Sequence, residues 1–215
     1  MHQTDLYDEA IQLAKSIYSE HFFNQDPLLY RSDAMIATLL VENNIHLDEH
    51  PFKAGSFCGM LIIDELETTI VYNKNHPVNR RNFTIAHELG HFFLHRNIQS
   101  KFIDRPKSLS DYIDSDIEKQ ANVFASELLI PQKVLVSMLI NRFNFYRIGK
   151  ITRASYECTK WRLVRHLMTH YGLSRNESLY LVEDYKQMSN MKLHRYSKIF
   201  DVLFYNSNFS LMEVK

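Results

Sequence analysis

The chain has 215 residues, of which 45% are hydrophobic and 23% are charged, and its formal net charge is zero. This composition is typical of a soluble globular protein with one good-sized domain, or with one domain and an appendage. It excludes a membrane-spanning chain, because the longest apolar runs, such as "VLVSMLI", are far too short to cross a bilayer.

The sequence also carries signals about location. The first ten residues, "MHQTDLYDEA", are polar and acidic, and they lack the basic and apolar regions of a signal peptide. Cys58 and Cys158 are the only cysteines, and their separation fits neither a metal site nor a disulfide scaffold. We therefore expect a cytoplasmic protein with two buried thiols and no membrane partner.

Charge is distributed unevenly along the chain. Residues 1–131 carry 11 Lys and Arg against 19 Asp and Glu, a net charge of −8, and residues 132–215 carry 14 against 6, a net charge of +8. This asymmetry favours two units that attract each other, or a basic surface for a partner, although a solvated helical face would give the same counts. Candidate contacts in the basic half are Arg162, Arg165 and Arg175.

The hydrophobic pattern predicts two helices and two strands in the first part of the chain. Apolar residues recur at helical spacing over residues 5–20 and again over residues 32–44. Residues 46–56 include a proline and a glycine and are predicted to form a loop. Two short apolar runs, 57–64 and 68–73, follow, and the polar residues between them favour an antiparallel pair.

The rest of the chain is predicted to be helical. A helical pattern covers residues 83–96. After a polar stretch over residues 97–115, another helix is predicted over residues 116–130, where Pro131 ends it. Beyond this proline the pattern stays helical, with a break at Tyr171-Gly172.

The order of these elements predicts an α+β fold. Strands lie among helices in residues 1–131, which favours one domain with N-terminal helices, a small antiparallel sheet and two further helices. Residues 132–215 contain no strand pattern, and we expect them to form an all-α, basic C-terminal region.

The stretch "NFTIAHELGHFFLH" carries a possible metal site. Within the predicted helix His87 and His91 are four residues apart, so their imidazoles lie on one face, one turn apart. Two such nitrogens can bind one ion at about 2.0–2.1 Å, the distance that zinc prefers. Glu88 is rotated away from this face and can reach a water molecule on the metal, as the base of a hydrolase must.

The alternative is a helix that carries histidines by chance. An apolar side that anchors the helix in a core argues against it, and Gly90 indicates that another segment packs closely there. Two other histidine pairs have the same spacing but lack the motif. We expect His46 and His50 to lie in a loop. We expect His166 and His170 to lie on the surface of a helix and to bind no second metal ion.

A third ligand must come from another segment. His95 lies eight residues, or about 12 Å, along the helix from His87 and cannot converge on the same ion. The best-placed carboxylate is Glu118, which begins the next predicted helix beside its apolar face. The alternatives are Glu127, Asp114 and Asp116. Each of these carboxylates could instead be a solvated surface charge.

Two segments in this order resemble a known family. "RNFTIAHELGHFFLH" followed by "EKQANVFASELLIP" is similar to the ImmA/IrrE family of zinc metallopeptidases. The upstream "AGSFCGMLIID" and "TTIVYN" are similar to the strand pair that precedes the motif there, so the resemblance covers about residues 30–131. It implies a zincin-like metallopeptidase domain with one zinc ion per chain. It also implies His87, His91 and Glu118 as metal ligands and Glu88 as the catalytic base.

The resemblance also implies a partner, because members of the family typically act on a helix-turn-helix transcriptional repressor and so relieve repression. We therefore interpret the chain as a zinc metallo-endopeptidase, a peptide-bond hydrolase that acts in gene regulation. The strand over residues 68–73 is a candidate edge for pairing with an extended substrate. Tyr72, Tyr112 and His95 are candidate donors to the oxyanion, and the favoured alternative for each is a buried structural role. Gln120 stands where the family often has an acidic residue, and we expect little consequence from this difference.

A second interpretation is a regulator that binds metal but cuts no bond. The metal would then be structural or sensory, and the basic half would contact protein or DNA. DNA is the less favoured partner, because the chain as a whole is neutral and its acidic half would repel phosphate. Glu88 favours the peptidase, and so does the ligand count, because a structural zinc site closes with four protein ligands and the sequence offers three.

Overall fold

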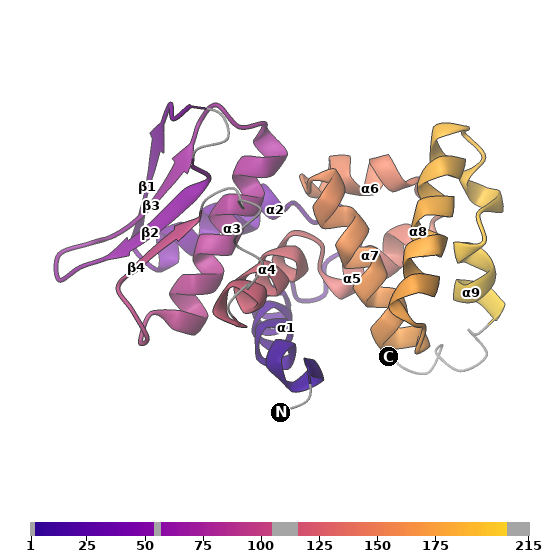
Figure 1. Cartoon of the computed structure of the whole chain (residues 1–215), viewed down its shortest axis with the longest axis horizontal. Helices are drawn as coiled ribbons and strands as arrows, with labels where there is room; N and C mark the ends of the chain where they lie inside the picture. The colour runs from indigo at the N-terminus through magenta and orange to yellow at the C-terminus, as the bar shows by residue number, and fades with distance from the viewer. Residues whose placement is uncertain (1–2, 54–56, 105–115, 206–215) are drawn as a thin grey trace.

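The computed structural model describes residues 3–53, 57–104 and 116–205, with a sheet at one end of the molecule and a group of helices at the other (Figure 1). The elements before Pro131 are α1 (Gln3–His21), η1 (Pro27–Leu29), α2 (Ser32–Glu42), β1 (Ile45–His50), β2 (Gly59–Ile63), β3 (Thr68–Asn73), α3 (Val78–His95), β4 (Lys101–Asp104) and α4 (Asp116–Leu129). Those after it are α5 (Gln132–Ile140), α6 (Phe145–Thr152), α7 (Tyr156–Tyr171), α8 (Arg175–Asn190), η2 (His194–Tyr196) and α9 (Ile199–Tyr205). The predicted fold class, an α+β part followed by a helical part, is confirmed.

The sheet has four strands in the order β1-β3-β2-β4. Strands β2 and β3 pair antiparallel, as the sequence predicts, with Leu61 opposite Ile70 in the core. β1 pairs with β3 in parallel, and β4 pairs with β2 on the other side. Because β3 lies inside the sheet, the hypothesis that it is a free edge for substrate is wrong.

Strands β1 and β4 occupy places where the sequence predicts a loop and a polar stretch. His46 and His50 belong to β1, so the prediction that they lie in a loop is wrong. Only Ile45 of this strand is buried. β4 has four residues, and its Phe102 is buried while Ile103 is exposed. Both strands lie at the edges of the sheet and are too short or too polar to show the alternation that predicts a half-buried strand.

Helix α3 covers one face of the sheet, and α4 packs against α3 (Figure 1). At their contact a Cβ added to Gly90 would lie 3.1 Å from the Cα and 3.2 Å from the carbonyl oxygen of Ala121. A side chain there would have to push the backbone of α4 away by a few tenths of an ångström, so glycine favours this close approach. The close packing predicted at Gly90 is confirmed.

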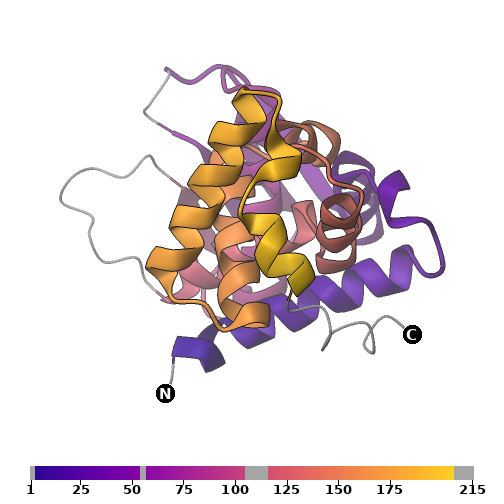
Figure 2. The same cartoon turned by 90° about the vertical axis from the view of Figure 1, so that its right-hand side faces the viewer.

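The helices after Pro131 continue the same core, in which buried residues of both parts form one cluster. α7 ends at Tyr171, where Gly172 adopts a left-handed conformation with φ of 65°. α8 then starts after Ser174, which forms a capping box with Glu177. The predicted break is thus confirmed, and α8 and α9 face the viewer in Figure 2. The division of the chain at residue 131 stays a prediction.

Of the helices that the structure describes, none by itself combines the length and the apolar composition needed to cross a membrane. One bent pair, α4 with α5, meets this test by length and composition only.

A buried ionic contact joins α4 to α7. The Glu127 carboxylate lies 2.8 Å from Nη2 of Arg162 and 3.2 Å from Nη1 of Arg165. Arg162 is 2% exposed and also donates through Nε to the carbonyl oxygen of Ile130 at 2.9 Å. Arg162 and Arg165, two of the three candidate contacts of the basic half, therefore bind within the chain, as expected if the basic half docks on the acidic half. Arg175 is exposed.

Replacing Glu127 with Gln is expected to destabilise the fold by about 3 kcal/mol, because Arg162 would stay buried without its carboxylate. Urea unfolding measures this loss. The matched control is Asp116→Asn in the same helix, where an exposed carboxylate pairs with Lys119 and its removal should cost less than about 1 kcal/mol. Equal stability of the two variants would contradict the proposed role of this contact.

Candidate metal centre

Helix α3 places the motif residues between the sheet and α4. The helix is buried over this part of its length. His87 is 2% exposed, His91 is 1% exposed and Glu88 is fully buried. The Nε2 atoms of His87 and His91 are 3.0 Å apart, as the four-residue spacing requires.

Glu118, in the first turn of α4, completes a group of three donors. Its Oε2 lies 3.3 Å from Nε2 of His87, and its Oε1 lies 3.3 Å from Nε2 of His91. Zinc bonds of 2.0–2.1 Å would place the donors of a tetrahedral site about 3.3–3.4 Å apart. The two distances to the Glu118 oxygens match this edge, and the 3.0 Å between the histidine nitrogens is slightly shorter. One donor atom from each residue lies within 4.8 Å of the others, so the group could hold one such ion.

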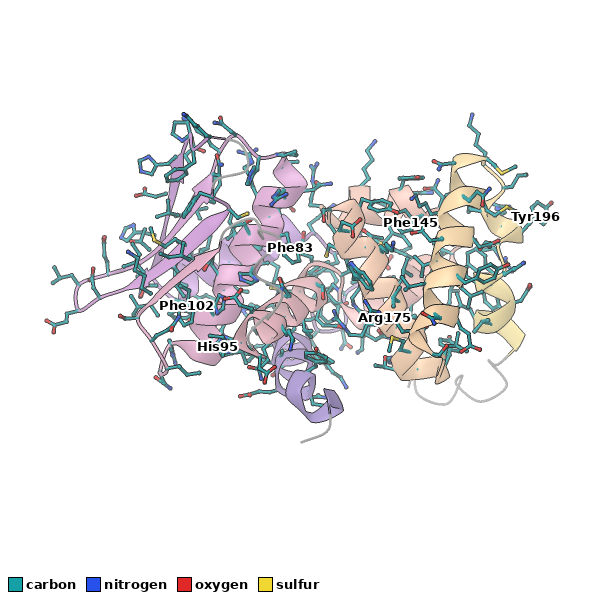
Figure 3. The ribbon with its side chains drawn as sticks, in the orientation of Figure 1. Phe83, His95, Phe102, Phe145, Arg175 and Tyr196 are labelled. Atoms are coloured by element: carbon teal, nitrogen blue, oxygen red, sulfur yellow. The ribbon has the colours of Figure 1, made fainter. Side chains whose placement is uncertain are left out.

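Side chains of α3, α4 and β4 orient the two histidines. Nδ1 of His87 lies 3.1 Å from Oδ1 of Asn122, which leaves Nε2 directed at the centre of the group. Nδ1 of His91 lies 3.0 Å from Nδ1 of His95. The His91 ring also stacks on Phe102, with 4.3 Å between ring centroids and 18° between planes. Figure 3 labels Phe102 and His95 near each other, and their ring centroids are 6.2 Å apart.

Burial and hydrogen bonding set the charges of these groups. The pKa of His91 is lowered to about 4, mainly by burial. The hydrogen bond with Glu118 raises this pKa, but its effect is smaller than that of burial. Burial alone would raise the pKa of Glu118, but hydrogen bonds with His87 and His91 outweigh it and hold this pKa well below its usual range. A neutral imidazole and an ionised carboxylate are the forms that bind a metal ion.

Glu88 lies where α3 approaches the sheet. A Cβ added to Gly59 of β2 would lie 3.0 Å from Oε1 of Glu88 and 2.3 Å from Cγ2 of Thr84. Gly59 therefore allows α3 to lie against β2 and keeps the Glu88 carboxylate in a confined place. The signal in the sequence that could have identified Gly59 is a glycine within an apolar run, which indicates a close approach of another segment.

Comparison with known proteins identifies the family of the chain. The family described as IrrE N-terminal-like domain, Peptidase_M78, matches residues 43–180. The chain belongs to this family. The match extends past Pro131 as far as α8, and the predicted resemblance to ImmA/IrrE proteins is confirmed.

Among curated proteins, the chain is similar to Metallopeptidase ImmA of Bacillus subtilis (strain 168), with 37% identity over 82 residues, 38% of this chain and 46% of that protein. Among solved structures, it is similar to a Mycobacterium tuberculosis transcriptional regulator, with 18% identity and a TM-score of 0.49 over 74% of this chain and 49% of that one. The chain thus spans about half the length of these relatives. Membership of a metallopeptidase family implies a metal, and the three donors described above are suited to one.

The alternative ligands of this family member lie elsewhere. Glu127 forms the ion pairs with α7, and Asp116 pairs with Lys119 at the exposed start of α4. Asp114 lies outside the described residues, as does Tyr112, one of the candidate oxyanion donors. Of the other two candidate donors, Tyr72 hydrogen bonds with Glu49, and His95 contacts His91.

The two histidines of the second pair differ in burial: His170 is exposed, as predicted, but His166 is not. His166 is 2% exposed, and its Nδ1 lies 3.1 Å from Nε2 of Gln132, so the prediction that it lies on a helix surface is wrong. Burial, with Arg162 and His170 nearby, lowers the pKa of His166 well below its usual range. The helix pattern alone does not reveal this burial, because Gln132, which contacts His166, belongs to a different segment.

The purified chain is expected to bind about one zinc ion. His87→Ala and His91→Ala should abolish binding, and Glu118→Ala should weaken it greatly, because each removes one of three donors. Metal content after dialysis measures this, with Asp116→Asn as the control that keeps full occupancy. Full zinc occupancy in Glu118→Ala would exclude it as a ligand.

Gly59→Ala is expected to destabilise the fold by about 1–3 kcal/mol, because the new Cβ would overlap Cγ2 of Thr84. Thr84→Ser removes that methyl group. The double variant should therefore be more stable in urea than Gly59→Ala alone. If adding Thr84→Ser lowers stability further, the overlap is not the cause.

Proposed function

We propose that this chain is a zinc-dependent endopeptidase that cleaves a regulatory protein in the cytoplasm. The observation that carries the proposal is the donor spacing of 3.0, 3.3 and 3.3 Å among His87, His91 and Glu118, with Glu88 directly after the first histidine. The substrate class, a helix-turn-helix transcriptional repressor whose cleavage relieves repression, is supported by the family resemblance alone.

The three donors define the metal-binding role. His87 and His91 bind through Nε2, and Glu118 binds through its carboxylate. A zinc ion held there would act as a Lewis acid on the scissile carbonyl group and would acidify a water nucleophile. Three protein ligands leave a fourth position open, which is the arrangement of catalytic rather than structural zinc sites.

Glu88 has the position of the catalytic base. It follows His87 in the helix, so its carboxylate projects beside the donors rather than among them. We assign it to accept the proton of the attacking water and then to deliver this proton to the leaving amine. Its complete burial strengthens that interaction, because charges interact more strongly where water is excluded.

Solvent and substrate would reach the centre from the side of Glu118. The side chains of His87 and His91 are 3% and 1% exposed, whereas that of Glu118 is 33% exposed. The sheet edges that could pair with an extended substrate are β1 and β4. β4 is the edge whose Phe102 touches the His91 ring, so it is the one next to the donors.

The alternative is a regulator that binds metal without proteolysis and acts through protein or DNA. Its basis was the basic half of the chain, but Arg162 and Arg165 are held by Glu127 inside the molecule. Arg175 is exposed, and its guanidinium lies over the Trp161 ring at 5.3 Å. The internal use of these arginines favours the peptidase over a DNA-binding role.

The variant Glu88→Gln distinguishes the peptidase from the regulator that cuts no bond. It keeps the size of the side chain but cannot accept the proton, so proteolysis should fall by about 10²–10⁴-fold or more. Zinc content and unfolding temperature should stay at the wild-type level. The measurement is cleavage of a purified helix-turn-helix repressor by metal-loaded protein, and derepression that persists in Glu88→Gln cells would favour the alternative.

A further inference from the structure

We infer that His95 and Gln120 form a neutral hydrogen-bond relay that holds His91 in the one tautomer able to bind the metal. The inference rests on the proposed metal site and gives two further side chains a positioning role in it. The relay runs from His91 Nδ1 to His95 Nδ1 at 3.0 Å, and from His95 Nε2 to Gln120 Oε1 at 3.0 Å.

The direction of the relay follows from donor and acceptor counting. His91 faces the other donors through Nε2, so that atom must be without a proton and Nδ1 must carry it. A bond between two Nδ1 atoms needs one donor and one acceptor, so Nδ1 of His95 must accept. The proton of His95 is then on Nε2, from which it is donated to Oε1 of Gln120.

The reverse direction is incompatible with metal binding. If the Gln120 amide were turned to donate, His95 would carry its proton on Nδ1 and donate it to Nδ1 of His91. His91 would then carry its proton on Nε2, the atom required by the metal. The orientation of one carboxamide in α4 is thus coupled, through His95, to the ligand atom of His91.

Geometry supports a positioning role rather than simple packing. His95 is 2% exposed and touches the Phe102 ring, which also stacks on His91, so neither imidazole can turn freely. The other histidine ligand is oriented in the same way, since His87 Nδ1 lies 3.1 Å from Oδ1 of Asn122. Residues 120 and 122 of α4 therefore direct both imidazoles with neutral carboxamides, where many zinc sites use a carboxylate.

The test compares three variants with wild type by zinc affinity, measured by competition with a chromophoric chelator. His95→Phe removes the acceptor for His91, and Gln120→Met removes the acceptor for His95, so each should weaken zinc binding by about 10–100-fold. Gln120→Glu should keep wild-type affinity, because a carboxylate accepts and cannot donate. His170→Phe, on the exposed end of α7, is the control and should leave affinity unchanged.

A packing role would give the opposite ranking. Met fills the space of Gln without charge, so a packing role predicts that Gln120→Met binds zinc normally and that Gln120→Glu binds it poorly; this result would overturn the relay. Circular dichroism of the metal-free variants checks that they are folded. Wild-type zinc affinity in His95→Phe would also overturn the relay.

Nitrogen NMR of histidine-labelled, zinc-loaded protein gives a second readout that does not depend on catalysis. The relay predicts a proton on Nε2 of His95 and on Nδ1 of His91, and a proton on Nδ1 of His95 would overturn it. The outcome for the proposed function is distinguishable from the outcome for the relay. If the wild-type chain binds zinc through this relay but cleaves no repressor, the peptidase proposal is contradicted and the relay is not.

Discussion

The candidate metal centre depends on how closely α3 and α4 approach each other. The two histidines share one helix, but their third partner comes from a segment 27 residues further along the chain (118 − 91 = 27), and only helix packing brings it near. Gly90 permits this approach, since any side chain there would meet the backbone of Ala121. The contact leaves Glu118 at 3.3 Å from both imidazoles, so the close packing at Gly90 contributes to the geometry of the group.

Local periodicity explains which parts of the site the sequence could predict. The spacing of His87, Glu88 and His91 is a property of one helix, so their relative placement needs no tertiary information. Glu118 could be ranked first because it lies beside the apolar face of its helix, but Glu127 on the same helix remained an alternative. The sequence could not separate them, because the partners of Glu127 are arginines of α7, a distant segment.

Tertiary context also explains what the sequence did not predict. β1 and β4 are held by backbone hydrogen bonds at the sheet edges, and pairing of this kind leaves little trace in the side-chain pattern. His166 and Arg162 are polar residues on α7, and polar residues of this kind are usually exposed. In the fold, Nδ1 of His166 contacts Gln132, and Arg162 contacts Gln132 and Glu127, and no single helix pattern reveals these partners.

Helix α4 links the metal centre to the C-terminal helices. Glu118 and Glu127 are nine residues apart, which at 100° per residue places them on opposite faces and about 13 Å apart along the axis. One carboxylate faces the histidines of α3, and the other faces the arginines of α7. The two carboxylates thus contact α3 and α7 from opposite faces of the same helix. The basic half of the chain is therefore joined through α4 to the candidate metal centre, although it supplies none of the three donors.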